Sequence, residues 1–259
     1  QQQQHWQQQQ VEEAAKGQGG LHGAGSTAPG AVGAAALAAT RDAKEMRKRR
    51  EEDFQRLTAD RAMLLQFQRE SAVSLKGVLH AAVNEPCPSV PGGFRPVIRL
   101  PSPHCRGGWL IFTRIDPARP DTSMIVHTRP GWVELRDYLT GQDRGGNRRC
   151  EAFVCTMSEA IYAQEMWRLL DPKGRLIPPQ HLQGRIVSVN REERKTIKRA
   201  TGGTQPPQLC IVLDDRTAVW EDKAQPHILA VAPFMPYATD TGPGLLGEKN
   251  GSGGGLGTA

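Results

Sequence analysis

The order of apolar and polar residues predicts a long helical segment before any sheet begins. Between residues 40 and 76, apolar side chains recur at roughly helical intervals among charged ones, and no Gly or Pro interrupts 41–76. Side chains three or four residues apart share one face of a helix, so this spacing predicts one long helix or a helical hairpin. Residues 84–96 are rich in Pro and Gly and are expected to end it. The apolar positions are Met46, Phe54, Leu57, Met63, Leu64 and Phe67.

Shorter apolar runs, bounded by turn residues, follow from residue 97 onward and predict strands. Continuous apolar runs of this kind suit a sheet that is covered on both faces. Helical patterns lie between them, one at 130–140 and one at 158–170 that opens with Ser158 as its cap. This alternation predicts an α/β layer with a largely parallel sheet over about 97–237. The runs are 109–112, 124–126, 152–155, 186–189, 209–213 and 228–232.

The two ends of the chain differ in composition from its middle. Eight of the first ten residues are Gln, and the rest of 1–40 is rich in Gly and Ala. Such segments bury too little apolar surface to offset the entropy of ordering them, so 1–40 and the Gly-rich 238–259 are expected to be disordered. The chain begins at Gln1 rather than Met, and we therefore expect a fragment of a longer protein.

Composition and charge exclude several classes of protein. No stretch approaches the run of about 18 apolar residues that spans a bilayer, which excludes an integral membrane protein. The five cysteines form no C-x-x-C pair and indicate neither a disulfide scaffold nor a structural zinc site, as is typical of a reducing compartment. With 33 basic and 27 acidic residues the net charge is +6, which is a mild excess and no polybasic footprint.

One run, at 41–50, is densely basic and has two interpretations. It could be a nuclear-import or nucleic-acid patch. Acidic residues are interleaved with it at helical spacing, and this pattern favours a solvated helix face held by intrahelical ion pairs. The acidic residues are Glu45, Glu51, Glu52 and Asp53.

Candidate chemistry follows three of the predicted strands. Ligands of a parallel α/β sheet bind beyond the carboxyl ends of its strands. A hydroxyl before a helix N-terminus can contact an anionic oxygen, adjacent carboxylates suit a hard cation such as Mg²⁺, and nearby positive charges suit a phosphate. Together these groups make a set for phosphoryl transfer. They are Thr156 after 152–155, Asp214 and Asp215 after 209–213, and Arg194, Lys195 and Lys198 after 186–189.

Each of these residues also has a purely structural interpretation. Thr156 is a suitable turn or helix cap, with Glu159 three residues further on. Adjacent aspartates before an arginine often form a turn with a salt bridge. Lys195 taken alone is one of many surface lysines. Their common place at strand ends, in this order, is what favours the functional interpretation.

Several long sequence motifs resemble those of a known family. They are TRPGWVELRDYL, FVCTMSEAIYAQEMWRLLDPKGRLI, RIVSV, RKTIKRA, IVLDDRTAVWED and QPHILAVAPFMPY. In this order they resemble the FCP-type phosphatases of the RNA polymerase II C-terminal domain, within the haloacid dehalogenase superfamily. They are most similar to the plant C-terminal-domain phosphatase-like proteins. The resemblance covers about 97–237.

This resemblance implies a fold and an activity. The fold would be α/β, with a haloacid dehalogenase-like Rossmannoid parallel sheet and helices on both of its faces. Residues 41–83 would be a charged helical insertion before the FCP-homology domain at 97–237. The activity would be Mg²⁺-dependent hydrolysis of phosphoserine or phosphothreonine in the C-terminal domain of RNA polymerase II, in the nucleus.

The resemblance also implies a role for each candidate residue. Thr156 would hydrogen-bond the transferred phosphoryl group, and Lys195 would neutralise its charge, with Lys198 as a second candidate. Asp214 and Asp215 would hold Mg²⁺ and its waters. An arginine in the R-P-G word, Arg129, would shape the site without reacting.

One motif of the family is missing. In these phosphatases the nucleophile and the general acid come from D-x-D-x-T at the end of the first strand, and the 259 residues contain no D-x-D. Asp116 and Asp121 lie near a strand end but have the wrong spacing. We therefore expect the first strand to lie upstream of Gln1 and the 259 residues alone to be inactive.

Two alternatives to an enzyme stay open. A phosphatase-like module without catalysis would bind phosphopeptide or act as a scaffold in transcription. Direct binding of RNA through the basic run is a weaker third interpretation. Trp132, Trp167 and Trp220 are assigned to core or rim packing, and Cys155 to the sheet, because it lacks the C-x5-R cradle of cysteine phosphatases.

Overall fold

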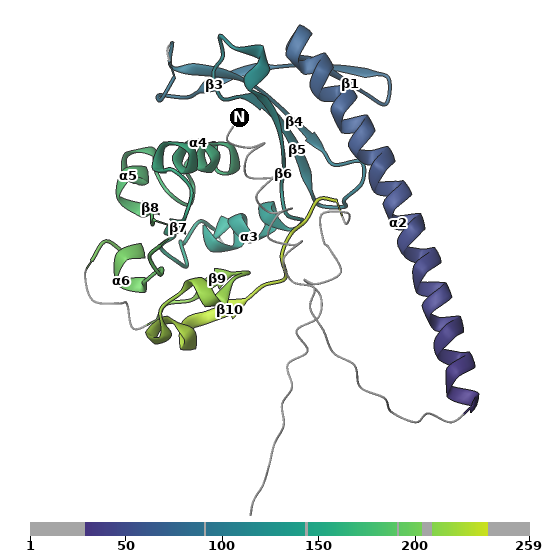
Figure 1. The fold of residues 1–259 in the computed structure, drawn as a ribbon. Helices are drawn as coiled ribbons and strands as arrows, with labels where there is room; N and C mark the ends of the chain where they lie inside the picture. The colour runs from purple at the N-terminus through teal and green to yellow at the C-terminus, as the bar shows by residue number, and fades with distance from the viewer. Residues whose placement is uncertain (1–28, 91, 143–144, 191, 204–208, 238–259) are drawn as a thin grey trace, which may run out of the picture. The chain divides into compact units, whose positions relative to one another are not determined.

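The computed structural model describes residues 29–90, 92–142, 145–190, 192–203 and 209–237 (Figure 1). The chain divides into two units. One comprises the residues up to Thr58 together with those from Met235 onward, and the other is Ala59–Phe234. The predicted disorder of 1–28 and 238–259 lies outside the described residues.

Helix α2 (Pro29–Glu70) is the long helix that the periodicity predicts. It begins earlier than expected, so the prediction of disorder is wrong for 29–40, where alanine, the best helix former, is frequent. The basic run is exposed along its whole length. Arg49 Nη2 lies 3.1 Å from Glu45 Oε1, and Lys48 Nζ lies 3.8 Å from Glu52 Oε1, which confirms a solvated face with intrahelical ion pairs.

The helix ends before the predicted position, so the expectation of helix through residue 83 is wrong after Glu70. Ser71 has φ of 51°, a left-handed conformation that stops the helix. Strands β1 (Ala72–Leu75) and β2 (Val78–Ala81) then form an antiparallel hairpin. Both loop residues, Lys76 and Gly77, have positive φ (49° and 78°), as tight two-residue hairpin loops require.

A four-stranded antiparallel sheet follows, and it corrects the parallel sheet predicted for this part of the chain. Its strands are consecutive neighbours in space. The connections at 102–108 and 115–122 are too short for the helical crossover that parallel strands need. The strands are β3 (Val83–Pro86), β4 (Phe94–Pro101), β5 (Trp109–Arg114) and β6 (Ser123–His127).

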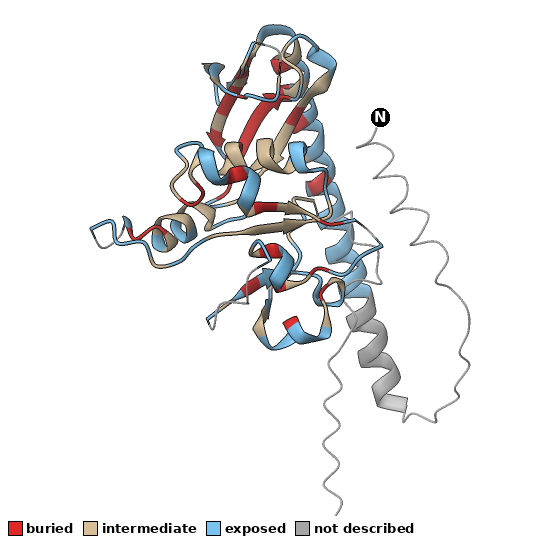
Figure 2. Cartoon of the chain, turned by 90° about the vertical axis from the view of Figure 1, so that its left-hand side faces the viewer, coloured by how far each residue is buried: buried red, intermediate tan, exposed pale blue. Residues whose placement is uncertain are grey.

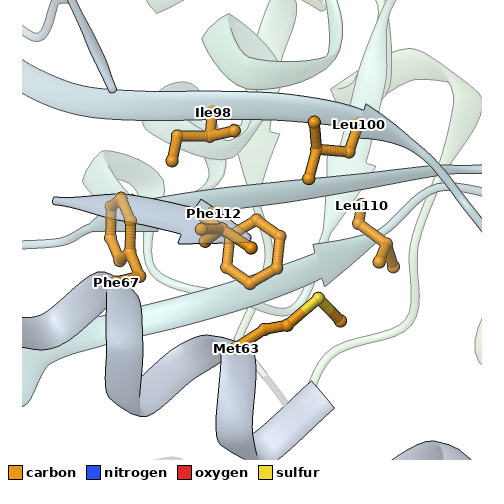
Figure 3. Close-up of a cluster of buried hydrophobic side chains, with 7 residues drawn as sticks. Met63, Phe67, Ile98, Leu100, Leu110 and Phe112 are labelled. Carbon is orange, nitrogen blue, oxygen red and sulfur yellow. The ribbon is translucent and has the colours of Figure 1, made fainter. Parts of the chain in front are cut away.

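One face of this sheet carries the main apolar core (Figure 3). Met63 and Phe67 from the C-terminal part of α2 pack on side chains from the middle strands, and the rings of Phe67 and Phe112 lie 5.9 Å apart. Arg114 fastens the end of the helix by donating to the carbonyl oxygens of Phe67 (3.1 Å) and Gln68 (2.9 Å). The sheet side chains in this core are Ile98, Leu100, Leu110 and Phe112.

The opposite face of the sheet packs on helix α4 (Ala160–Leu170), so the middle strands are buried on both sides (Figure 2). Val97 and Ile111 contact Leu169 there. Two arginines of β4, four residues apart, bind carbonyls of α4 that are also four residues apart. Arg95 Nη2 donates to Glu165 O (2.7 Å) and Arg99 Nη2 to Leu169 O (3.0 Å). The sheet thereby fixes the helix that follows Thr156.

The second half of Ala59–Phe234 contains the parallel pairing that the sequence predicts. Strand β7 (Val154–Thr156) pairs with β8 (Ile186–Ser188), and β9 (Val212–Asp214) pairs with β10 (Ile228–Ala230). The mixed α/β class is thus confirmed. Hydrogen bonds join these strands as two separate pairs in the part of the chain that is described, and not as one continuous sheet.

Short helices connect these strands. The predicted helix at 130–140 is α3 (Trp132–Leu139), and α5 (Leu182–Arg185) and α6 (Ile197–Ala200) flank β8. The cap of α4 is Glu159 and not the predicted Ser158. Short 3-10 helices complete the described elements, at Pro120–Thr122, Pro179–His181, Thr217–Val219 and Asp222–His227. None of the helices in the described ranges has the length and apolarity to cross a bilayer.

Candidate functional site

The ends of two parallel strands and one extended segment contribute the candidate site residues. Thr156 is the last residue of β7, and Asp214 is the last residue of β9. Lys195 lies just before α6 and forms a parallel bridge with Trp220. In this bridge Lys195 N donates to Val219 O (2.8 Å), and Glu221 N donates to Lys195 O (3.0 Å). The backbone thus places the lysine beside the segment that follows Asp214.

Lys195 and Asp214 form a buried ion pair. Lys195 Nζ lies 2.8 Å from Asp214 Oδ2, and the two side chains are only 6% and 10% exposed. At this distance the ion pair is also a charge-assisted hydrogen bond. The structure therefore joins two of the residues that the sequence predicted from separate strand ends.

Asp214 accepts two further hydrogen bonds. Trp220 Nε1 donates to Oδ2 (2.8 Å), and the Arg216 backbone N donates to Oδ1 (2.9 Å). Burial alone would raise the pKa of the Asp214 carboxyl. The Lys195 ammonium and these two N–H groups bind its ionised form and hold the pKa below the usual value. Asp214 is thus a carboxylate at neutral pH, and both of its oxygens have donors.

Asp215 differs from Asp214 in its exposure to solvent and in its contacts. It is exposed, and it makes no hydrogen bond or ion pair with any residue that the structure describes. Its oxygens therefore stay available for a ligand from solution. The sequence predicts the two adjacent aspartates as one cation site, but their surroundings differ. Asp214 is paired with Lys195, and Asp215 is exposed to solvent.

The donor chemistry of this strand end fits a magnesium ion. Mg²⁺ prefers carboxylate oxygens, keeps several waters and is often held by only one or two protein carboxylates. Asp215 offers such oxygens, and Asp214 adds negative charge beside it. No group of three or more His, Cys, Asp or Glu suited to a metal occurs within the described ranges, so these residues alone make no all-protein cage.

Thr156 is both a turn cap and a free donor. Its Oγ1 accepts a hydrogen bond from Ser158 N (3.1 Å), which agrees with the structural interpretation of a strand-end threonine. Its backbone O accepts from Val189 N (2.8 Å), and this bond extends the β7–β8 pairing. A hydroxyl that accepts one bond still has its proton to donate. The cap orients Oγ1 without using that proton.

Cys155 shows that the end of β7 lies near the ion pair. Its side chain packs against the apolar cluster that contains Trp220 and Val212. Burial raises the pKa of the Cys155 thiol, an effect to which Asp214 adds and which Lys195 and Arg199 oppose. The thiol is therefore protonated at neutral pH and packs as part of the sheet, as its assignment from the sequence expected.

Three other predicted residues lie outside the ion pair. Lys198 is exposed on α6, and its ammonium contacts none of the described acidic groups. Arg194 Nη1 binds the exposed Asp222 at 3.0 Å. Arg129 Nη2 donates to Ala232 O (2.7 Å), and its guanidinium lies 5.6 Å from the centre of the Phe234 ring. Arg129 thereby ties the segment after β6 to the segment after β10.

Trp220 is the residue whose role the sequence interpretation missed. The sequence pattern predicts that it packs, and it does pack in a buried cluster, but its indole N–H also donates to the carboxylate of Asp214. The available signal was a buried tryptophan six residues after a strand-end aspartate, because a buried indole N–H usually finds an acceptor. The packing assignment is confirmed for Trp132 and Trp167, whose rings lie 5.8 Å apart in a T-shaped contact.

Comparisons with known proteins agree with the family resemblance of the sequence motifs. Residues 102–246 match the family described as NLI interacting factor-like phosphatase. Over 186 residues, or 71% of this chain, the sequence is 39% identical to RNA polymerase II C-terminal domain phosphatase-like 1 of Arabidopsis thaliana. The chain spans 19% of the length of that relative. No solved structure matches. The predicted resemblance to plant C-terminal-domain phosphatase-like proteins is confirmed.

Proposed function

Because the chain belongs to the NLI interacting factor-like phosphatase family, we propose that it forms part of the active site of a Mg²⁺-dependent protein-serine/threonine phosphatase. Its substrate is the phosphorylated C-terminal domain of RNA polymerase II, and its place of action is the nucleus. The substrate follows from the name of the Arabidopsis relative. The domain is the haloacid dehalogenase-like module that the sequence motifs indicate.

The buried Lys195–Asp214 pair is the main observation that supports this proposal. A lysine that is 6% exposed and only 2.8 Å from a carboxylate presents a fixed positive charge at the strand ends. Such a charge stabilises a phosphoryl group in the transition state without reorganisation, which is how most phosphoryl-transfer sites act. An exposed surface lysine would offer no such fixed charge.

Each residue of this chain has a defined task in the proposed reaction. The ammonium of Lys195 neutralises negative charge on the phosphoryl oxygens, and the hydroxyl of Thr156 donates a hydrogen bond to one of them. Asp214 orients Lys195. Asp215, with Asp214 beside it, would hold Mg²⁺, which when bound supplies further positive charge to the phosphate. Arg129 shapes the wall of the site.

The attacking carboxylate has to come from a segment that these 259 residues do not contain. They include no D-x-D, and the two aspartates near the end of β5 have structural partners. Asp116 Oδ1 accepts from Ala118 N (3.0 Å), and Asp121 Oδ2 binds Arg119 Nη2 at 2.6 Å. We place the nucleophile on an additional parallel strand that pairs with the two-stranded sheets β7–β8 and β9–β10 and joins them into one Rossmannoid sheet.

Turnover of p-nitrophenyl phosphate with Mg²⁺ tests this proposal. The 259-residue chain alone is expected to be inactive, and a chain extended by a strand with D-x-D-x-T is expected to be active. Asp215→Asn should abolish that activity, whereas Asp222→Asn, which alters an exposed aspartate bound to Arg194, should leave it intact. Hydrolysis by the 259 residues that is lost in Asp215→Asn would show that the nucleophile lies within them.

A binding module is the second candidate, because Thr156, Lys195 and the aspartates are present while D-x-D is absent. Such a module would bind a phosphoserine heptad peptide through Lys195 and would stay inactive when the strand is added. Fluorescence anisotropy with phosphorylated and unphosphorylated peptide distinguishes the two functions. The binding module predicts phosphate-dependent affinity that Lys195→Met removes, without turnover in the extended chain.

A further inference from the structure

We infer that Trp220 is a positioning residue of this site: its indole N–H fixes the carboxylate of Asp214, and through it the ammonium of Lys195. The inference rests on the proposed function for its biological meaning, but the contacts on which it stands belong to the folded chain itself. Trp220 thereby has a specific role in the site, whereas the sequence pattern assigns it only to packing.

Two donors converge on a single oxygen of Asp214. Trp220 Nε1 and Lys195 Nζ both lie 2.8 Å from Oδ2, while Oδ1 accepts from the Arg216 backbone at 2.9 Å. Hydrogen bonds to an ionised acceptor are about twice as strong as neutral ones. The indole N–H therefore restricts the rotation of the carboxylate about its terminal bond, and the oxygen that faces Lys195 stays in one place.

Trp220 is itself held rigidly. It is 4% exposed within the cluster of Ile197, Ala200, Val212 and Ala224. Its backbone N donates to Thr217 O (3.1 Å), and its backbone O accepts from Gln225 Nε2 (3.3 Å). Lysine, in contrast, has a flexible four-carbon stem and needs outside contacts to hold its ammonium in one position. The rigid group thus orients the flexible one.

The ring of Trp220 contacts Lys195 directly as well. Lys195 Nζ lies 5.4 Å from the centre of the indole, within the range of a cation–π interaction. The ammonium is therefore held between the carboxylate and the ring that hydrogen-bonds the same carboxylate. Removing the N–H while keeping a ring separates these two effects.

Two other tryptophans of this unit show that the contact is not a general consequence of burial. Trp132 Nε1 donates to a backbone carbonyl, Leu170 O, at 3.0 Å. Trp167 Nε1 is buried and has no acceptor among the described residues. Of these three indoles, only that of Trp220 binds a side-chain carboxylate, and that carboxylate is the partner of the candidate catalytic lysine.

Nuclear magnetic resonance of the Lys195 ammonium in the 259-residue chain tests the inference. With ¹⁵N-labelled lysine, the Lys195 signal is assigned by its loss in Lys195→Met. In Trp220→Phe, which keeps a ring and loses the N–H, solvent exchange of the ammonium protons should accelerate about tenfold, which corresponds to about 1.4 kcal/mol. Trp132→Phe loses an indole hydrogen bond of similar length and should leave the rate unchanged.

An unchanged exchange rate in Trp220→Phe, or an equal acceleration in Trp132→Phe, overturns the inference. Should Trp220→Phe fail to fold, the indole N–H signals of an Asp214→Asn chain decide. The Trp220 signal should move upfield, because an amide oxygen accepts more weakly than a carboxylate, while the Trp132 signal should stay. A Trp220 signal that does not move contradicts the role. These readouts need no turnover, so their failure is distinct from a failure of the phosphatase assay.

Discussion

The antiparallel sheet and the parallel strand pairs of Ala59–Phe234 are stabilised in different ways. In the antiparallel sheet, apolar side chains are buried on both faces, and Leu110 and Phe112 are 0% exposed. In the β9–β10 pair, Leu213 and Leu229 are 51% and 59% exposed. The polar residues of the site lie at the ends of β7 and β9. The antiparallel sheet therefore provides most of the buried apolar core, and the parallel strand pairs provide the residues of the candidate site.

The exposed face of β9–β10 gives this difference a physical meaning. Parallel sheets in known folds are covered on both faces, and isolated two-stranded sheets are marginally stable. Leu213 and Leu229 are paired neighbours on the outer side and are both more than half exposed. Apolar side chains of this pair are therefore exposed on one face, in contrast to those in the middle of the antiparallel sheet.

The largest expected effect is in the antiparallel core. Phe112→Ala should lower the free energy of unfolding by about 3–5 kcal/mol, because a fully buried ring is lost and a cavity stays behind. Phe94→Ala is the matched control, since Phe94 lies on the same sheet and is 54% exposed. Urea unfolding measures both. Equal losses would break the assignment of stability to the buried face.

The next largest effect is at the site. Lys195→Met should cost about 3 kcal/mol, because it leaves the buried carboxylate of Asp214 without its cation. Replacing both partners, with Lys195→Met and Asp214→Leu together, should recover much of that loss. Chemical denaturation of the single and double variants gives the coupling. A double variant less stable than Lys195→Met alone would show that the pair stabilises the fold more than it serves chemistry.

Acid should weaken the site through the same pair. The pKa of Asp214 is lowered in the folded chain from the reference value of 3.8. Its contribution to stability is therefore complete above about 3.8 and is lost as the pH falls through the lower folded pKa. The stability difference between the wild type and Asp214→Asn should be constant from pH 7 to 5 and shrink below pH 4. A difference that grows on acidification would contradict this sign.

The smallest effect is expected at Ile211, the exposed residue directly before β9. Ile211→Thr should change the free energy of unfolding by less than about 0.5 kcal/mol, since the side chain is 78% exposed. The same denaturation assay applies. A loss close to that of Phe112→Ala would show that the Ile211 side chain is covered in the folded chain and would remove the contrast between the two regions.

Sequence reasoning predicted the elements better than their pairing. Apolar runs at 109–112 and 124–126 are strands β5 and β6, because burial on both faces leaves a continuous apolar signature. That signature does not depend on strand direction, so the antiparallel pairing was missed. Short connections were the usable signal. The end of α2 was missed because the residues of β1 (Ala72–Leu75) follow Ser71 without Gly or Pro, so that the sequence there stays compatible with a helix.

The candidate site was predicted in part for a similar reason. Strand-end reasoning named Thr156, Lys195 and Asp214, and the structure pairs the last two. It could not distinguish Asp214 from Asp215, because the difference arises from side-chain contacts with Lys195 and Trp220 that form only in the folded chain. The burial of a lysine and the partner of an indole N–H depend on how these segments pack in the folded chain.

The most direct test of the central claim is phosphate release from a phosphoserine heptad peptide by the chain extended with a D-x-D-x-T strand. If the buried lysine is the phosphoryl-binding cation, Lys195→Met should lower kcat about 100-fold or more. Lys223→Met, which removes an exposed lysine, should leave kcat within about twofold. Equal rates for Lys195→Met and the unchanged extended protein would contradict the account.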